Sequence, residues 1–459
     1  MKFVQWRRTA WRRFFAGAAF VAGLSGCAPT EQRAHFAAQK RIWNQQTSSQ
    51  DHGPTNEPFL DEHVLHRERL IAEVLNRNPS LDSARQAWGE ALARYPQVTA
   101  FSDPSLAYQT APGSILSPHG FGQMIQLKQR FEWPGKQALR GAIALAEADA
   151  KEADIERVKL HLRTTASLLY DNYFAKGLAL QINQAHQKLV TKLRQSAEAQ
   201  YVAGRADQQD PLSADVELAL IEQERVRLSA ELQVTAAQLN GLLHRPADAQ
   251  LPPPPLTLEV ATVPERSLQE WRQVAQENRP ELHTGSETIR ARQNDVKLAK
   301  KAYFPDFSVN GTYNSMWPQL EHQLMVGFSL NIPIQLVARR GRQSQANTAL
   351  ARAELELRES QITVDVEVQE AITRFNESVL QVGVYQQKIL PSARRQIEAA
   401  EAAYTSGRSS FSSIMTAQRR LRTFERAYAD ALAETWRRRA LLARSVGLAT
   451  INQNNGSLQ

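Results

Sequence analysis

The chain contains the same succession of segments twice, about 200 residues apart. The letters LNRNPSL at 75–81 are echoed by NRPEL at 278–282, and AEAQYVAGR at 197–205 is echoed by AEAAYTSGR at 400–408. Between the echoes, each copy has short segments of alternating apolar and polar residues and then one very long helical segment. Such self-similarity indicates duplication of one structural unit, and 459 residues are enough for two units.

Alternation with a period of two predicts two pairs of β-strands, at about 104–112 and 121–131 in the first copy and at about 305–315 and 322–333 in the second. Each strand has one apolar and one polar face and the length that a tilted membrane strand needs. Aromatic residues lie near the strand ends, as in interfacial girdles: Phe101, Phe131, Trp133, Tyr303, Phe304 and Trp317. A half-buried sheet of a soluble protein would show the same alternation.

Each strand pair is followed by an exceptionally long helical segment, at 135–203 and at 339–405, and then by a return helix, at 209–245 and at 411–447. At about 1.5 Å per residue, each long helix spans about 100 Å. Pro391 predicts a bend in the second long helix. Apolar residues step by three and four, which is coiled-coil spacing. A solid rod and a hollow tube would both use this spacing.

The N-terminus reads as a secretory signal peptide over residues 1–26, with a basic start and a short apolar stretch. Leu24-Ser25-Gly26-Cys27 resembles a lipobox, in which the cysteine becomes the first mature residue and carries diacylglycerol and an N-acyl lipid. Cys27 is the only cysteine in the chain. Ala28 follows it, and in the lipoproteins that this segment resembles, a residue other than Asp favours sorting to the outer membrane.

Cleavage would remove five basic residues and no acids, which lowers the net charge from +8 to +3. The mature chain is therefore only mildly basic, and no nucleic-acid partner is expected. Beyond the N-terminus no apolar run is long enough for a transmembrane helix.

The remaining segments are connections. Residues 27–66 are predicted as an extended, lipid-anchored arm, 251–266 as a proline-rich linker, and 448–459 as a disordered tail. The two repeats then occupy 67–250 and 267–447. The arm histidines His35, His52, His63 and His66 do not form a metal site by their spacing, so no metal is expected. No catalytic motif is present, and the chain is not expected to be an enzyme.

Four strands cannot close a barrel, because about eight are the practical minimum. An open sheet in lipid would leave edge amide groups unpaired at a cost of several kcal/mol each. The chain is therefore expected to pool its strands with copies of itself. Two copies would supply eight strands and three would supply twelve, and the strand count leaves both open.

Several short motifs, in the same order in both repeats, resemble TolC-like outer-membrane efflux proteins. They are the helix start Asn78-Pro79-Ser80-Leu81, the strand start Asp103-Pro104-Ser105-Leu106, the strand exit Gln129 to Lys136, and the Y-x-x-G-R turns that begin at Tyr201 and Tyr404. The strand exit FEWPGK is most similar to the cobalt–zinc–cadmium and copper–silver efflux branch. The resemblance covers nearly all of the mature region.

The resemblance implies a mainly α-helical protein with a small transmembrane β part. Three copies would form a 12-stranded β-barrel that continues into an α-helical periplasmic tube. It implies an outer-membrane exit duct that passively exports divalent metal ions or drugs. The partners would be a periplasmic adaptor (a membrane fusion protein) and an inner-membrane pump of the RND (resistance–nodulation–division) type. The alternatives are a periplasmic adaptor or structural coiled-coil lipoprotein, and a lipid-anchored envelope enzyme.

The resemblance also places the two turns at the periplasmic tips of the tube. Gly204 and Gly407 are expected to end the long helices in a left-handed conformation. Together with Arg205 and Arg408 they are the candidate residues for docking the adaptor.

Acidic side chains just past the first tip are candidates for a gate, because symmetry copies of a carboxylate in a lumen would repel one another and attract cations. The candidates are Asp207, Asp210 and Asp215. Asp210 best matches a gate position of the family, whereas Asp215 also suits the first turn of a helix. The second tip departs from the family pattern, because it carries Ser409, Ser410, Ser412 and Ser413 in place of acids.

Overall fold

The computed structural model describes residues 29–48, 59, 62–113, 121–317 and 320–451. The predicted signal peptide, Cys27, His52 and most of the predicted tail lie outside these residues. No helix in the described part of the chain is both long enough and apolar enough to cross a membrane.

The chain divides into two compact units, each assembled from three separate stretches. The first comprises residues 1–51, 85–153 and 283–359, and the second comprises 52–84, 154–282 and 360–459. Both units therefore contain parts of both sequence repeats.

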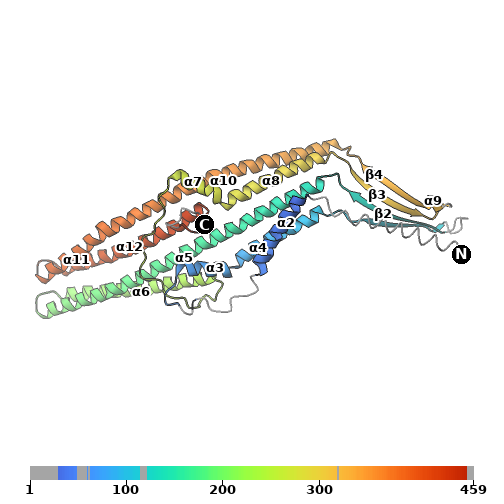
Figure 1. Ribbon diagram of the computed structural model, residues 1–459. Helices are drawn as coiled ribbons and strands as arrows, with labels where there is room; N and C mark the ends of the chain where they lie inside the picture. Colours follow the sequence, from blue (N-terminus) through green and yellow to red (C-terminus); the bar gives the residue numbers. More distant parts are fainter. Residues whose placement is uncertain (1–28, 49–58, 60–61, 114–120, 318–319, 452–459) are drawn as a thin grey trace. The chain divides into compact units, whose positions relative to one another are not determined.

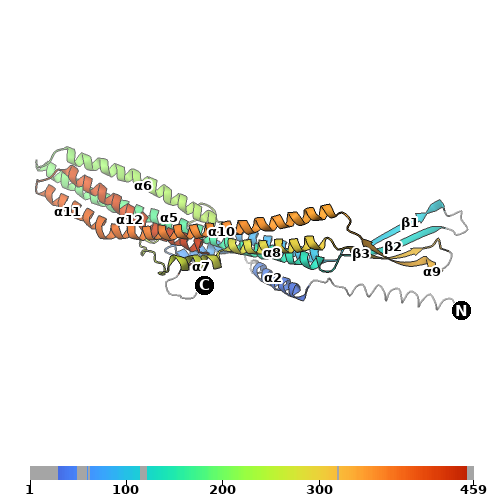
Figure 2. The same cartoon turned by 90° about the horizontal axis from the view of Figure 1, so that it is seen from above.

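The first unit holds one antiparallel sheet with the strand order β1-β2-β3-β4 (Figure 1 and Figure 2). Its strands are β1 (Ser105–Ala111), β2 (Gly122–Phe131), β3 (Asp306–Asn314) and β4 (Leu324–Asn331), with the short helix α9 (Leu320–Gln323) before β4. All four predicted strands are present, and their ends lie within two residues of the predicted ones. The middle pair, β2 and β3, joins the two repeats.

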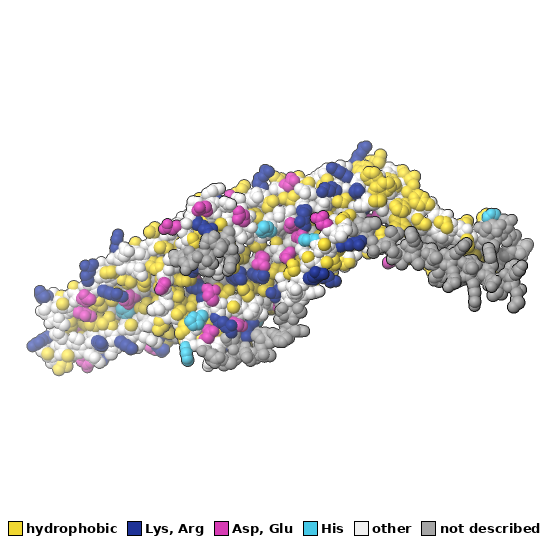
Figure 3. Space-filling view, viewed as in Figure 1, with side chains coloured by type: hydrophobic (Ala, Val, Ile, Leu, Met, Phe, Trp, Pro, Cys, Tyr) yellow, Lys and Arg dark blue, Asp and Glu magenta, His cyan; other side chains and the backbone are white. Residues whose placement is uncertain are grey.

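The register puts apolar residues on one face of the sheet, because directly paired residues point the same way. Leu127 pairs with Gly311, which pairs with Val326. Hydrophobic side chains gather on the surface over β3 and β4 (Figure 3). The exposed apolar residues of this face are Leu106, Tyr108, Ile125, Leu127, Val309, Tyr313, Leu324, Val326, Phe328 and Leu330. On the polar face, Ser308 and Thr312 are buried. The apolar face is thus largely exposed, the reverse of a half-buried soluble sheet.

The extended arm predicted for residues 27–66 is wrong over its first half, where α2 (Thr30–Ser48) is a helix. Phe36 stacks on Tyr95 with ring centroids 4.8 Å apart, and the indole nitrogen of Trp43 donates to the carbonyl of Arg85 at 3.0 Å. Phe36 and Trp43 are seven residues apart, so both lie on the same face of a helix. These tertiary contacts stabilise a helix in a segment whose composition is mainly polar.

Each repeat begins with two helices that are separated by one extended residue. The helices are α3 (Arg67–Arg77) and α4 (Pro79–Thr99) in the first repeat, and α7 (Leu268–Asn278) and α8 (Pro280–Lys301) in the second. The intervening residues have ψ values of 116° and 118°, because a residue before proline disfavours the helical conformation.

The two intervening residues, Asn78 and Arg279, have equivalent contacts in the second unit. The amide of Asn78 donates to the carbonyl of Leu242 at 3.1 Å, and the guanidinium of Arg279 donates to the carbonyl of Ser445 at 3.1 Å. Leu242 and Ser445 are the last residues of the return helices α6 (Gln209–Leu242) and α12 (Phe411–Ser445). Different side chains therefore satisfy the exposed carbonyl groups at the same two helix ends.

The long helix of the first repeat is α5 (Lys136–Val202), which is unbroken. The second consists of α10 (Leu336–Val384), a π-helical turn η2 (Tyr385–Ile389) and α11 (Leu390–Thr405). Pro391 has no N–H group, and its ring would clash with the carbonyl four residues earlier, at Gln387. The wider π turn lies at this point, so the residue predicted to bend the helix coincides with a local change of helical pitch.

Helices α5, α6, α11 and α12 contribute to one apolar cluster in the second unit. Its buried members are Val190, Ala197, Ala214, Ile221, Tyr404, Phe411, Ile414 and Met415. This cluster lies where the two long helices end and the two return helices begin. Packing in this cluster therefore holds together the four helix ends that the two tip turns connect.

Ion pairs join α6 to α12 beside this cluster. The carboxylate of Glu217, which is fully buried, lies 2.6 Å from Arg419 and 3.0 Å from Arg422. Seven residues further along both helices, Glu224 lies 2.5 Å from Arg426. The seven-residue spacing keeps the pairs on the facing sides of two helices that run in the same direction.

Candidate functional site

The two tip turns have the same backbone geometry. Gly204 and Gly407 have φ values of 69° and 72°, as predicted for helix-ending glycines. In each turn the glycine amide donates to the carbonyl three residues earlier, and the amide of the next residue, Arg205 or Arg408, donates to the carbonyl five residues earlier, at 2.8–2.9 Å. Both turns are therefore Schellman motifs, which satisfy the last carbonyl groups of the long helices.

The candidate gate residue Asp210 accepts a hydrogen bond from the phenol of Tyr404 at 3.1 Å. This bond joins the first turn of α6 to the last turn of α11, and so connects the two tips. The ring of Tyr404 packs against Phe411 with centroids 5.4 Å apart. Burial, the charge of Asp210 and the hydrogen bond raise the pKa of Tyr404 to about 12, so the phenol is a proton donor at every physiological pH.

Tyr404 is a further candidate residue, which the sequence analysis placed only in a turn motif. Its counterpart Tyr201 is 43% exposed, whereas Tyr404 is 8% exposed. A signal was present in the sequence, because Ile397, Tyr404 and Phe411 follow one another at seven-residue intervals. The residue seven before Tyr201 is Arg194, which is polar.

The other two candidate acids have different surroundings. The side chain of Asp207 is exposed, and its backbone carbonyl accepts from the amide of Asp210 at 3.1 Å, which starts α6. Asp215 lies on α6 and its carboxylate is 2.5 Å from Arg194 of α5. Asp215 therefore holds α5 and α6 together, and the structure brings only Asp210 into contact with the second tip.

The candidate docking residues Arg205 and Arg408 are both exposed. Arg408 donates to the hydroxyl of Ser406 at 2.9 Å. At the second tip, the hydroxyl of Ser410 lies 2.8 Å from that of Ser412 and 3.1 Å from that of Ser413. The second tip thus presents one cation and a hydroxyl cluster, without a carboxylate of its own.

A second polar contact that the sequence analysis missed lies between α5 and α12. His186, which is buried, contacts the carboxylate of Glu425 at 2.8 Å through Nε2, and Gln418 lies 3.1 Å from its Nδ1. Nothing in the local sequence pairs these residues, which are more than two hundred positions apart. Among the described residues, no group of three or more His, Cys, Asp or Glu side chains is placed to hold a metal ion.

Sequence comparison relates the second half of the chain to a known family. Residues 271–448 match the family described as outer membrane efflux protein. The match runs from within α7 to just past the end of α12 and includes the second tip. No curated protein matches the sequence of this chain significantly.

The fold of the chain is similar to those of several solved outer-membrane channels. CusC has a TM-score of 0.71 at 18% identity, over 86% of this chain and 95% of that chain. VceC from Vibrio cholerae has a TM-score of 0.70 at 18% identity, over 83% of this chain and 96% of that chain. The outer-membrane channel OprN has a TM-score of 0.70 at 18% identity, over 85% of this chain and 94% of that chain. The predicted TolC-like fold is therefore confirmed.

Proposed function

We propose that three copies of this chain form an outer-membrane exit duct of an efflux system. In each copy the four strands would contribute to a shared 12-stranded barrel, and the long helices to a periplasmic tube. The duct is a passive path for substrates that an inner-membrane pump of the RND type delivers through a periplasmic adaptor. Its chemistry is that of a channel, without a catalytic step.

The observation that carries this proposal is the exposed apolar face of the sheet. The side chain of Val326 is 87% exposed and that of Leu106 is 72% exposed, while Ser308 on the polar face is buried. Exposure of such a face to water is unfavourable by about 25 cal/mol per Å². Hydrocarbon lipid is the environment that this face fits, and its polar opposite would face water.

The edges of the sheet support association with further copies. Within the described residues, β1 pairs only with β2 and β4 pairs only with β3, so each has one edge without a strand partner. Each unpaired backbone group costs several kcal/mol in lipid. Pairing of β4 with β1 of the next copy satisfies both edges, and three copies close the ring.

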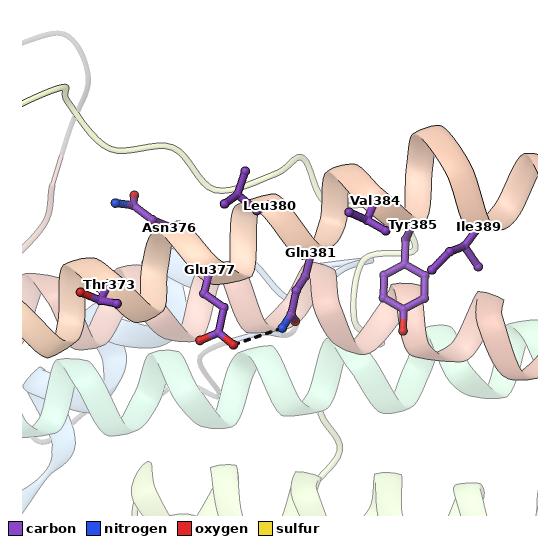
Figure 4. Close-up of a pocket in the computed structure, with 8 residues that line it drawn as sticks. All are labelled: Thr373, Asn376, Glu377, Leu380, Gln381, Val384, Tyr385 and Ile389. Atoms are coloured by element: carbon purple, nitrogen blue, oxygen red, sulfur yellow. Dashed lines mark hydrogen bonds between the residues drawn. The ribbon is translucent and has the colours of Figure 1, made fainter.

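In the described part of the chain, helices of the second unit also have exposed apolar residues. A groove follows α10 and η2 (Figure 4), lined by Thr373, Asn376, Glu377, Leu380, Gln381, Val384, Tyr385 and Ile389. Leu380 is 71% exposed and Val384 is 45% exposed. On α6, exposed apolar residues form a second stripe: Leu212, Val216, Leu220, Val226 and Val234. We propose that α6 of one copy packs against this groove of the next.

At the tips, the hydrogen bond between Tyr404 and Asp210 would hold the two hairpins of one copy together and keep the duct closed at rest. Adaptor docking through Gly204, Arg205, Gly407 and Arg408 would then separate the tips. Lipid on Cys27, the first residue of the mature chain, would anchor the protein in the outer membrane.

The test is the mass and the conductance of the full-length protein after extraction in mild detergent. Light scattering is expected to give three chains per particle, and the purified particle is expected to form channels in a planar lipid bilayer. A monomer without channel activity would contradict the duct and favour a periplasmic adaptor or a structural lipoprotein. Mass spectrometry of the N-terminal peptide tests the lipid on Cys27 separately.

A further inference from the structure

The polar face of the sheet carries three charged side chains, and two of them are positive. The four strands contain two cations, Lys128 and Arg130, and one carboxylate, Asp306. All three lie on the polar face, because Lys128 pairs with Asn310 and Arg130 pairs with Ser308. The remaining side chains of this face are neutral.

The one carboxylate of the strands is fully engaged. Asp306 lies 2.7 Å from the ammonium of Lys136 and 3.1 Å from the guanidinium of Arg130, and it accepts from the amide of Trp133 at 3.0 Å. Two cations therefore compensate one negative charge. Asp306 presents no uncompensated negative charge to the polar face.

Lys128 has different surroundings. Its partners across the sheet are Ser105 on β1 and Asn310 on β3, and its neighbours along β2 on the same face are Gln126 and Arg130. The side chain of Lys128 is exposed, and no carboxylate in the described part of the chain forms an ion pair with it. Its charge is therefore uncompensated within the sheet.

We propose that Lys128 forms a cationic selectivity ring that makes the barrel prefer anionic over cationic solutes. This inference rests on the proposed trimeric barrel, in which symmetry places three Lys128 ammonium groups on the water-facing wall at one level. Rings of Lys or Arg are the usual basis of anion selectivity in pores. At about 0.1 M salt the Debye length is about 10 Å, so such a ring acts on ions across much of the lumen.

The acids at the tips have the opposite sign. Asp207 and Asp210 would favour cations, and the exposed Arg205 and Arg408 at the same tips would favour anions, so the ion selectivity of the intact channel is the sum of several contributions. The contribution of Lys128 is consequently measured as a difference between variants in the same channel.

The experiment is the reversal potential of single channels under a KCl gradient, with about 0.1 M salt on the dilute side. Lys128→Cys removes the charge, and water-soluble methanethiosulfonate reagents then add a positive or a negative charge at the same site. Leu127→Cys is the matched control, because the adjacent side chain lies on the apolar face. The unsubstituted protein, treated with the same reagents, reports any reaction at Cys27. Lys128→Gln removes the positive charge without introducing a thiol.

We expect Lys128→Cys and Lys128→Gln to lower the anion-to-cation permeability ratio by about twofold or more. The negative reagent should lower the ratio of Lys128→Cys further, the positive reagent should restore it, and Leu127→Cys should not respond. Channels whose reversal potential is the same in all these forms would overturn the selectivity ring alone. If the unsubstituted protein forms no channels, the proposed duct fails, and the selectivity ring fails with it.

Discussion

Tyr404 and Tyr201 occupy equivalent positions in the two repeats, yet only Tyr404 is buried and donates a hydrogen bond to Asp210, at 3.1 Å. The same motif thus makes an inter-tip contact in one repeat and an exposed side chain in the other. A duplicated sequence has produced two tips with different contacts.

Replacing Tyr404 with Phe should weaken closure of the tips. The substitution keeps the ring that packs on Phe411 and removes the hydroxyl, and a hydrogen bond to a charged group is worth on the order of 1–3 kcal/mol. Single-channel conductance in a lipid bilayer should rise. Tyr201→Phe is the matched control and should leave conductance unchanged.

Asp210→Ala should raise conductance to the same extent, because it removes the acceptor of the same bond. Combining Asp210→Ala with Tyr404→Phe should add little, since residues that act through one contact are not additive. Additive increases would show that the two side chains act independently, and unchanged conductance in both single variants would contradict their role in closure.

Replacing Glu217 with Ala should strongly destabilise the second unit. The change leaves Arg422, which is largely buried, and Arg419, which is half exposed, without their shared partner, and a hydrogen bond to a charged group is worth about 1.5–3 kcal/mol. The thermal unfolding midpoint, followed by circular dichroism, should fall clearly. Glu222→Ala on the same helix removes only an exposed pair with Arg225 and should have little effect.

The buried carboxyl of Asp171 should make stability depend on pH. Burial raises its pKa from 3.8 to about 6, against the lowering effect of Arg67, whose guanidinium donates to it at 3.1 Å. Because the folded state binds this proton more tightly than the unfolded state does, the contribution is present below pH 3.8 and is lost as the pH rises through 6.

The measurement is the thermal midpoint of the unsubstituted protein minus that of Asp171→Asn, which cannot titrate. This difference should decrease between about pH 4 and pH 6 and then become constant. A difference that increases over this range would mean that the Arg67 guanidinium outweighs burial and that the pKa of Asp171 is lowered.

Two glycines with the same backbone conformation should respond differently to alanine. Gly407 and Gly447 have φ values of 72° and 76°, so alanine is strained at both, by about 1 kcal/mol. At Gly407 the new Cβ meets open space, whereas at Gly447 it would lie 2.5 Å from the carbonyl oxygen of Asn278. Gly447→Ala should therefore lower the yield and the thermal midpoint of folded protein more than Gly407→Ala. Equal decreases in the thermal midpoint would mean that backbone strain alone accounts for the destabilisation, without a contribution from the clash at Gly447.

Much of the secondary structure was predictable because it follows from the local periodicity of apolar residues. Alternation over 306–314 places Val309 and Tyr313 on one face of a strand whatever the strand packs against. The positive φ of Gly204 and Gly407 follows in the same way from the end of a long helical pattern. The helix over 30–48 was missed because its stability comes from contacts such as Phe36 on Tyr95, which local composition does not contain.

By itself, the sequence determined which segments become strands and long helices, since hydrogen bonding and side-chain periodicity within each segment are local properties. Only the tertiary structure decided which side chains meet. It paired Asp210 with Tyr404 and Asp215 with Arg194. Within the described residues it gave Lys128 no carboxylate partner, whereas Asp306 is paired with Lys136. These contacts join positions far apart in the chain, where geometry depends on the packing of whole helices and on strand register.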